Sequence, residues 1–252
     1  MIREYHRPQT LDEALTLLNQ PDTLPLGGGT LLSQSTSASV EVVDLQALGL
    51  NTVKKLGNNL EIGATTTLQQ LLEDANCPDA LKSALKLEAP LNLRNMATVA
   101  GALVSCDGRS TFTTALLALD AKLITFISQQ PGSPWDSATI NLGDFLPLRT
   151  RGLITLIIIP LNVKLAFEYV SRTPADKPIV CAALAQWNSG RTRLALGGYG
   201  NSPMLAMDGT EADGLETAAR NAFHEATDEW ASAEYRSDIA AVLAKRCLET
   251  LP

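Results

Sequence analysis

The stretch "RNMATVAGALVS" (residues 94–105) joins an Arg-Asn pair to a run of small residues that includes Thr98, Ala100, Gly101 and Ala102. It is too polar at its start for a buried strand and lacks the Lys of a P-loop, and its many small residues argue against a packing helix. Small residues let another group come close to the backbone. We therefore expect a loop at which a ligand approaches the main chain.

A second stretch with little side-chain bulk follows the apolar segment at residues 23–26, where Gly27, Gly28, Gly29 and Thr30 stand in succession. Glycines adopt positive φ values readily, so successive backbone N–H groups can point at one anion. A glycine turn between strands also needs no ligand, so this turn alone leaves both interpretations open. Two such loops together favour a diphosphate. Because neither loop contains Lys, amide dipoles must meet its charge.

Length and charge limit the class of protein. A chain of 252 residues can form one large domain or two smaller ones with a sizeable core. Its 27 acidic residues outnumber its 20 basic ones, and the net charge of −7 argues against nucleic acid or an anionic membrane as the main partner. The longest apolar run is "LITLIIIP" (residues 153–160), so we expect neither a signal peptide nor a membrane span.

The cysteines and histidines indicate no metal centre. The four cysteines are far apart in sequence and form no CxxC-type pair: Cys77, Cys106, Cys181 and Cys247. The sequence therefore predicts neither an iron–sulfur cluster nor a structural zinc site. His6 and His224 have no neighbouring ligand set, and we expect ordinary surface or packing roles for both. The simplest interpretation is a reduced, cytoplasmic protein.

Helical and strand patterns alternate along the first part of the chain. Helices are predicted to start at Thr10 and Thr67, each with a capping-box pattern, and to span 78–88 and 111–120. Strands are predicted at 23–26, 40–45, 60–64, 121–127 and up to Pro160, with a loop at Pro131, Gly132 and Pro134. Strands at 165–172, 178–187 and 191–196 then precede helices at 211–226 and 236–250. This order predicts an α+β fold of two units with a cleft between them.

Seven motifs in this order resemble the FAD-binding middle (medium) subunit of the molybdenum hydroxylases, the family of carbon monoxide dehydrogenase and xanthine dehydrogenase. They are "YHRPQTLDEAL", "GGGTLL", "IGATTTLQQL", "LRNMATVAGAL", "ALLALDA", a strand closing on "IIIP", and "SAEYRSDIAAVLAKR". Each motif is weak alone, but all seven in the correct order are specific. The match runs nearly from one end of the chain to the other.

The resemblance implies an α+β fold with two domains. The first is a two-lobed FAD-binding domain of the molybdopterin dehydrogenase type over residues 1–161, with lobes of about 1–55 and 56–161. The second is a smaller α+β domain of the carbon monoxide dehydrogenase flavoprotein type over residues 162–252. The flavin is expected in the cleft between them.

The resemblance also implies a function, that of an oxidoreductase subunit with FAD as its cofactor. In such a complex, electrons leave a molybdenum centre in a large subunit, cross iron–sulfur clusters in a small subunit and reach the flavin. The flavin passes them to a small-molecule acceptor such as NAD⁺, a quinone or oxygen. The substrate is oxidised in another chain, so we expect no catalytic side chain here.

By position, the resemblance assigns the FAD diphosphate to backbone N–H groups of two loops. The first loop consists of Gly27, Gly28, Gly29, Thr30 and Leu31, and the second of Thr98, Val99, Ala100, Gly101 and Ala102. Thr111 and Arg172 complete the predicted cofactor-binding set. Arg172 corresponds to an Arg that lies towards the flavin cleft in the family, and a salt bridge between lobes is the alternative.

Four residues depart from the family pattern. Leu31 stands where an acidic residue is usual, Ala102 replaces an Asn, Thr111 replaces an Asp, and Glu168 replaces a Lys of the xanthine dehydrogenase branch. Losing the hydrogen bonds of an Asn and a carboxylate costs roughly 0.5–1.5 and 1.5–3 kcal/mol, or about 30-fold to 2,000-fold in affinity. We therefore expect FAD to bind through backbone amides, either more weakly than in the family at large or in an altered redox environment.

Two alternatives stay open. The first is a flavin-depleted structural member that keeps the fold and the assembly surface of the family. The second is a stand-alone flavin reductase on a related fold, which the C-terminal motifs disfavour. Bound flavin separates the first alternative from the electron-transfer subunit, and the presence of partner subunits separates the second.

Overall fold

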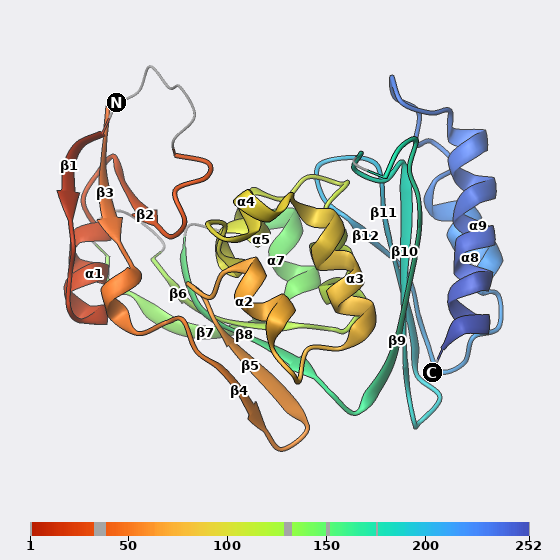
Figure 1. Ribbon diagram of the computed structural model, residues 1–252, viewed down its shortest axis with the longest axis horizontal. Coiled ribbons are helices and arrows are strands. Elements are labelled where there is room, and N and C mark those ends of the chain that lie inside the picture. The colour runs from red at the N-terminus through yellow and green to blue at the C-terminus, as the bar shows by residue number, and fades with distance from the viewer. Residues whose placement is uncertain (1, 33–38, 129–132, 150–151, 175, 252) are drawn as a thin grey trace.

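The structure is a computed structural model that describes residues 2–32, 39–128, 133–149, 152–174 and 176–251. Three β-sheets follow one another along the chain, each with helices packed against it (Figure 1). We refer to them as the N-terminal, central and C-terminal units. The predicted loop at Pro131, Gly132 and Pro134 lies mostly outside the described residues.

The N-terminal unit is a three-stranded parallel sheet in the order β1-β3-β2. Its strands are β1 (Ile2–His6), β2 (Thr23–Leu26) and β3 (Val40–Asp44), and helix α1 (Leu11–Leu18) packs on one face. Helix α1 begins at Thr10, whose Oγ1 accepts a hydrogen bond from the Glu13 amide. Leu15 and Leu18 of the helix share a core with Val43 of the sheet. A short 3-10 helix, η1 (Gln46–Leu48), follows β3 and precedes the first strand of the central unit.

The central unit is a five-stranded antiparallel sheet in the order β4-β5-β8-β6-β7. The strands are β4 (Val53–Leu56), β5 (Asn59–Gly63), β6 (Lys122–Ile127), β7 (Asp136–Asn141) and β8 (Gly152–Pro160). The apolar strand β8 lies at the centre because its many Ile and Leu side chains can be buried there.

Helices of the central unit cover its sheet (Figure 1). They are α2 (Leu68–Glu73), α3 (Asp79–Glu88), α4 (Leu91–Arg94), α5 (Val99–Ser105), α6 (Thr111–Ala118) and α7 (Leu142–Leu148). Helix α2 starts with the predicted capping box between Thr67 and Gln70. Helix α6 is buried along its whole length. It therefore forms the centre of the core.

The C-terminal unit is a four-stranded antiparallel sheet in the order β12-β11-β10-β9. Its strands are β9 (Val163–Val170), β10 (Val180–Trp187), β11 (Thr192–Gly197) and β12 (Met204–Gly209). Helices α8 (Leu215–Ala222) and α9 (Ala233–Thr250) cover its outer face, and α3 and α6 of the central unit pack against the other (Figure 1). The predicted α+β fold is confirmed.

The interface between the central and C-terminal units is packed with apolar side chains. Ala183 and Ala185 of β10 belong to the core of the central unit, whereas Ala182 and Leu184 belong to the core under α8 and α9. The strand is thus buried on both faces. The sequence predicted a cleft between the first α+β unit and the C-terminal one. At this face of the C-terminal sheet the structure has a packed apolar interface instead. The domain boundary at 161/162 stays a prediction.

Candidate functional site

A cavity of about 230 Å³ lies between the N-terminal and central units. Its wall is formed by the loop after β2, the residues after β5, the start of α5 and the start of β8. None of its described lining residues carries a charged side chain. Any ligand held there must therefore be recognised by backbone groups, hydroxyls and apolar contacts.

Two of the sequence motifs form one hydrogen-bonded framework beside this cavity. The amide of Leu68 donates to Ala97 O at 3.0 Å, and the amide of Val99 donates to Thr66 O at 2.9 Å. The amide of Ala100 also donates to Ala64 O at 3.3 Å. The stretches "IGATTTLQQL" and "LRNMATVAGAL" are therefore held together before any ligand binds.

Arg94 fixes the entry to the second motif. Its guanidinium donates to the carbonyl oxygens of Lys86 at 3.1 Å and Ala89 at 2.7 Å, and its Nε donates to Gln69 Oε1 at 3.0 Å. These bonds tie α4 to α2 and to the end of α3. Arg94 is therefore a structural residue that positions the stretch after it.

The glycines of the first loop pack directly on this framework. A Cβ atom on Gly28 would lie 1.7 Å from the carbonyl oxygen of Met96, and one on Gly27 would lie 2.8 Å from Thr98 Oγ1. Gly29 has a φ of +69°, which favours glycine. The first loop therefore needs its glycines for a close contact between two backbones and for a turn, whether or not a ligand is bound.

The backbone N–H groups of the two loops differ in their availability, which corrects part of the sequence analysis. The predicted second loop is the first turn of helix α5, with Thr98 as its N-cap. The amide of Gly101 donates to Thr98 Oγ1 at 3.2 Å and that of Ala102 to Thr98 O at 2.9 Å. With Val99 and Ala100 bonded as above, these four amides all have protein acceptors.

The first loop keeps open donors. The amides of Gly28 and Gly29 donate to no oxygen within the described ranges of the chain. Both residues line the cavity. The amide donors available to an anion therefore come from the first loop, and α5 supplies a wall.

Two neighbouring threonines after β5 carry hydroxyls without partners. The Oγ1 atoms of Thr65 and Thr66 are buried and have no hydrogen-bond partner among the described residues. Thr65 lines the cavity, and Thr66 is not among its lining residues. Thr98 Oγ1 accepts from Gly101, while the Thr98 hydroxyl proton has no described acceptor. The cavity thus offers neutral donors, as an oxyanion site requires.

The structure brings most of the predicted cofactor-binding residues to one place. Those in the cavity wall are Gly27, Gly28, Gly29, Thr30, Leu31, Thr98, Ala100 and Gly101. Val99 is fully buried in the central core, and Ala102 packs against that core. Sequence reasoning missed other wall residues, among them Ala64, Thr65, Ser105 and Gly152.

Thr111 lies away from the cavity. It is fully buried at the start of α6, and its Oγ1 donates to Ala84 O at 2.7 Å and lies 3.2 Å from the Glu88 carboxylate. The same carboxylate accepts from the Phe112 amide at 2.9 Å and so caps α6. Thr111 therefore has protein partners and does not line the cavity.

Arg172 also lies elsewhere, in the connection between β9 and β10. Its Nε is 3.7 Å from the Asp176 carboxylate, and its guanidinium lies 4.4 Å from the centroid of the Trp230 ring. Arg109 lies over the same ring at 4.8 Å. The ion pair is local rather than a bridge between lobes. Glu168, the fourth departure, is on β9 opposite Ala182 and is not among the cavity residues.

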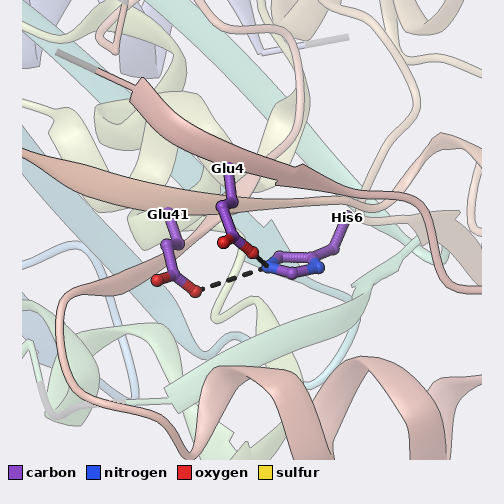
Figure 2. Close-up of side chains that lie close together, drawn as sticks. All are labelled: Glu4, His6 and Glu41. Atoms are coloured by element: carbon purple, nitrogen blue, oxygen red, sulfur yellow. Dashed lines mark hydrogen bonds and ion pairs between the residues drawn. The ribbon is translucent and has the colours of Figure 1, made fainter.

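A separate group of side chains meets on the N-terminal sheet (Figure 2). His6 Nε2 lies 3.5 Å from Glu4 Oε2 and 3.4 Å from Glu41 Oε2, with Glu4 and His6 on β1 and Glu41 on β3. Arg3 also contacts Glu41, at 3.7 Å. None of these residues lines the cavity. A hydrogen bond between His6 and Glu41 and the ion pair of Arg3 with Glu41 hold this group together.

Burial keeps the cysteine thiols protonated. Desolvation raises the pKa of Cys77, Cys181 and Cys247 to about 12, and it raises the pKa of Cys106 as well. The thiolate is the form that binds metals and acts as a nucleophile. These four cysteines are therefore mainly in the thiol form at neutral pH in the folded chain. No helix in the described ranges is both long and apolar enough to cross a membrane.

Comparisons with known proteins show a matching family and two relatives of this chain. Residues 1–162 match the family described as "FAD binding domain in molybdopterin dehydrogenase". The glyceraldehyde dehydrogenase medium chain of Sulfolobus acidocaldarius is 31% identical over 225 residues, which cover 81% of this chain and 78% of that protein. The carbon monoxide dehydrogenase medium chain of Afipia carboxidovorans is 24% identical over 281 residues, which cover 98% of this chain and 95% of that protein.

Solved structures share the fold. The cyanide-inactivated form of Cu,Mo-CO dehydrogenase aligns with a TM-score of 0.81 at 24% identity, covering 100% of this chain and 98% of that one. Quinoline 2-oxidoreductase from Pseudomonas putida 86 aligns with a TM-score of 0.77 at 20% identity, covering 98% and 96%. At these identities the likeness is one of fold.

Proposed function

The chain belongs to the family of FAD-binding domains of molybdopterin dehydrogenases, and on that premise we propose that it is the electron-transferring FAD subunit of a molybdenum hydroxylase complex. One observation carries the proposal. Among the described residues, the cavity between the N-terminal and central units is lined by no charged side chain, and the amides of Gly28 and Gly29 in its wall have no acceptor.

This donor set fits a diphosphate. Phosphate oxygens accept hydrogen bonds and donate none at neutral pH, and the described wall contains the unused amides of Gly28 and Gly29 together with Thr98, with the buried hydroxyl of Thr65 beside them. Its volume of about 230 Å³ is below the roughly 300–1,000 Å³ of ligand pockets in general. The cavity therefore suits the middle of a dinucleotide, with the rest of FAD lying beyond it.

The predicted site residues then take two kinds of role. Gly27 to Leu31, Thr98, Ala100 and Gly101 surround the diphosphate. Val99, Ala102, Thr111 and Arg172 act indirectly, by holding α5, α6 and the C-terminal unit in place. Held in this way, FAD supplies the chemistry of accepting electrons and passing them on.

The electrons must come from another chain. The buried, separated cysteines give this chain no iron–sulfur ligand set within the described residues. We propose a small iron–sulfur subunit as the donor and a large molybdenum subunit as the site of substrate oxidation, with a small-molecule acceptor for the flavin's electrons. The designation of both relatives as medium chains supports partners of other sizes.

The test is a flavin assay on the full chain, purified alone and after co-expression with its candidate partner subunits. We expect flavin absorbance in the purified protein, FAD rather than FMN on release by denaturation, and saturable uptake on titration of the flavin-free chain. A chain that carries no flavin and takes up none contradicts the proposal. If such a chain still co-purifies with the partner subunits, it is the flavin-depleted assembly member.

A further inference from the structure

Thr65 and Thr66 are adjacent buried residues whose hydroxyl groups both lack a hydrogen-bond partner among the described residues. Thr65 is 2% exposed and Thr66 is fully buried. Most buried polar side-chain atoms in folded proteins have a partner, because an unpaired one has lost its hydrogen bonds to water without replacement. Each of these hydroxyls therefore calls for an explanation.

The backbone gives neither residue freedom to find a partner within the protein. The amide of Thr65 donates to Leu50 O at 2.9 Å, and the amide of Thr66 donates to Gly63 O at 3.0 Å. The carbonyl of Thr66 is held by the Val99 amide at 2.9 Å. A missing partner for the hydroxyl must therefore come from outside this framework.

The two threonines differ in one respect that bears on a ligand. Thr65 belongs to the cavity wall, in the same wall as Gly28, Gly29 and Thr98, whereas Thr66 does not. Rotation about χ1 moves a threonine hydroxyl between three staggered positions. A rotation that turns the buried Thr65 hydroxyl into the cavity brings it to a ligand there, whereas Thr66 contributes no atom to the wall.

We propose that the Thr65 hydroxyl donates a hydrogen bond to an oxygen of the FAD diphosphate, which makes Thr65 a cofactor-binding residue. This inference rests on the proposed function and adds to it a side-chain donor outside the two small-residue loops. The hydroxyl is unpaired in the flavin-free chain and paired in the complex. Binding energy thus comes partly from relieving an unsatisfied group.

The experiment compares Thr65→Val, Thr65→Ser and Thr66→Val in the full chain. Valine keeps the shape of threonine and removes the hydroxyl, serine keeps the hydroxyl, and Thr66→Val removes a neighbouring orphan hydroxyl that is not in the wall. Two quantities are measured for each variant: the Kd for FAD from flavin fluorescence titration, and the thermal midpoint of the flavin-free protein.

We expect Thr65→Val to weaken FAD binding by roughly 10-fold to 150-fold, the range for a hydrogen bond to a charged group. The flavin-free Thr65→Val protein keeps or raises its thermal midpoint, because an unsatisfied hydroxyl is lost. Thr66→Val shows the same thermal behaviour with FAD affinity unchanged, and Thr65→Ser binds FAD within about 3-fold of the wild type. A purely structural role for Thr65 would not lower FAD affinity while keeping or raising the thermal midpoint of the flavin-free protein.

Two outcomes overturn the inference alone: equal FAD affinity in Thr65→Val and wild type, or an equal loss in Thr66→Val. If Thr65→Val does not fold, Thr65→Ala takes its place, with the same expected loss of affinity relative to Thr65→Ser. A wild-type chain that binds no FAD overturns the proposed function and this inference together, so the two failures are distinguishable.

Discussion

The backbones of Gly28 and Met96 are in contact, and a Cβ atom on Gly28 would lie 1.7 Å from the Met96 carbonyl oxygen. This contact joins the first loop of the N-terminal unit to the framework of the central unit, at the edge of the cavity. No side chain can be accommodated there unless the two loops separate. The geometry of the cavity therefore depends on this glycine.

We predict that Gly28→Ala weakens FAD binding by more than 10-fold and lowers stability, because the added methyl group pushes the open amides of Gly28 and Gly29 away from α5. Flavin titration and thermal unfolding of the flavin-free chain measure the two effects. Gly143→Ala is the control, since its Cβ would meet Leu117 Cδ1 at an ordinary 3.6 Å. An unchanged Kd in Gly28→Ala would show that the loop contact does not shape the site.

Arg172 gives a prediction of the opposite kind. Its guanidinium stacks on Trp230, and Arg172 is not among the cavity residues. Arg172→Gln should therefore leave the Kd for FAD within about 2-fold of the wild-type value. It should lower the free energy of unfolding by about 0.5–1 kcal/mol, as expected for an exposed cation–π contact. Trp230→Leu removes the same contact from the other side. A large loss of FAD affinity in Arg172→Gln alone would instead place this residue at the flavin.

Asp228 neutralises a buried cation, because Arg236 is fully buried and its Nη2 lies 2.7 Å from the Asp228 carboxylate. Removing one member of such a pair leaves an uncompensated charge. We predict that Asp228→Asn lowers the free energy of unfolding by about 3 kcal/mol, measured by denaturant titration. Asp238→Asn is the control, since its pair with Arg220 is exposed and should contribute less than about 1 kcal/mol. Equal effects in the two variants would contradict the assignment.

Asp208 predicts a pH dependence of stability. A hydrogen bond from Arg191, aided by the charge of Arg193, holds the pKa of the Asp208 carboxyl below its usual value. A carboxyl with a lowered pKa in the folded state stabilises the protein above its unfolded pKa, and this contribution is lost as pH falls through the folded pKa. Asp208→Asn should therefore be less stable than wild type at pH 7, with the gap narrowing below about pH 4. Urea titrations at several pH values measure this gap, and a constant gap would refute the linkage.

Much of the fold follows from local sequence patterns. The capping residues Thr10 and Thr67 and the apolar strand up to Pro160 are where the patterns place them, because N-caps and continuous apolar runs act over short distances. The edge strand β7 (Asp136–Asn141) carries only two apolar residues, Ala138 and Ile140, a pattern too short to predict its pairing with β6. The prediction of a loop at α5 was wrong. Its small residues suggested close approach of a ligand, yet they form a helix with Thr98 as its N-cap.

The meeting of the two small-residue stretches could be predicted from the sequence, whereas the hydrogen bonds around them could not. The glycine run and the small-residue stretch do meet at one cavity, because both need a close backbone approach. The sequence could not show that the amides of Val99 and Ala100 already have acceptors, since those acceptors, Thr66 O and Ala64 O, belong to another segment. Nor could it single out Thr65, whose unpaired hydroxyl depends on the whole of its surroundings.

The absence of charge from the cavity wall has a consequence for the behaviour of the cofactor in solution. Contacts from amides and hydroxyls act at hydrogen-bond range, whereas ionic strength weakens interactions beyond the Debye length, which is about 10 Å at 0.1 M salt. We therefore predict that the Kd for FAD changes by less than about 3-fold between roughly 0.05 and 0.5 M sodium chloride. An anion site built on Lys or Arg would release its ligand as salt rises, and a steep salt dependence measured by flavin titration would count against this one. Such a chain should keep its flavin through high-salt chromatography.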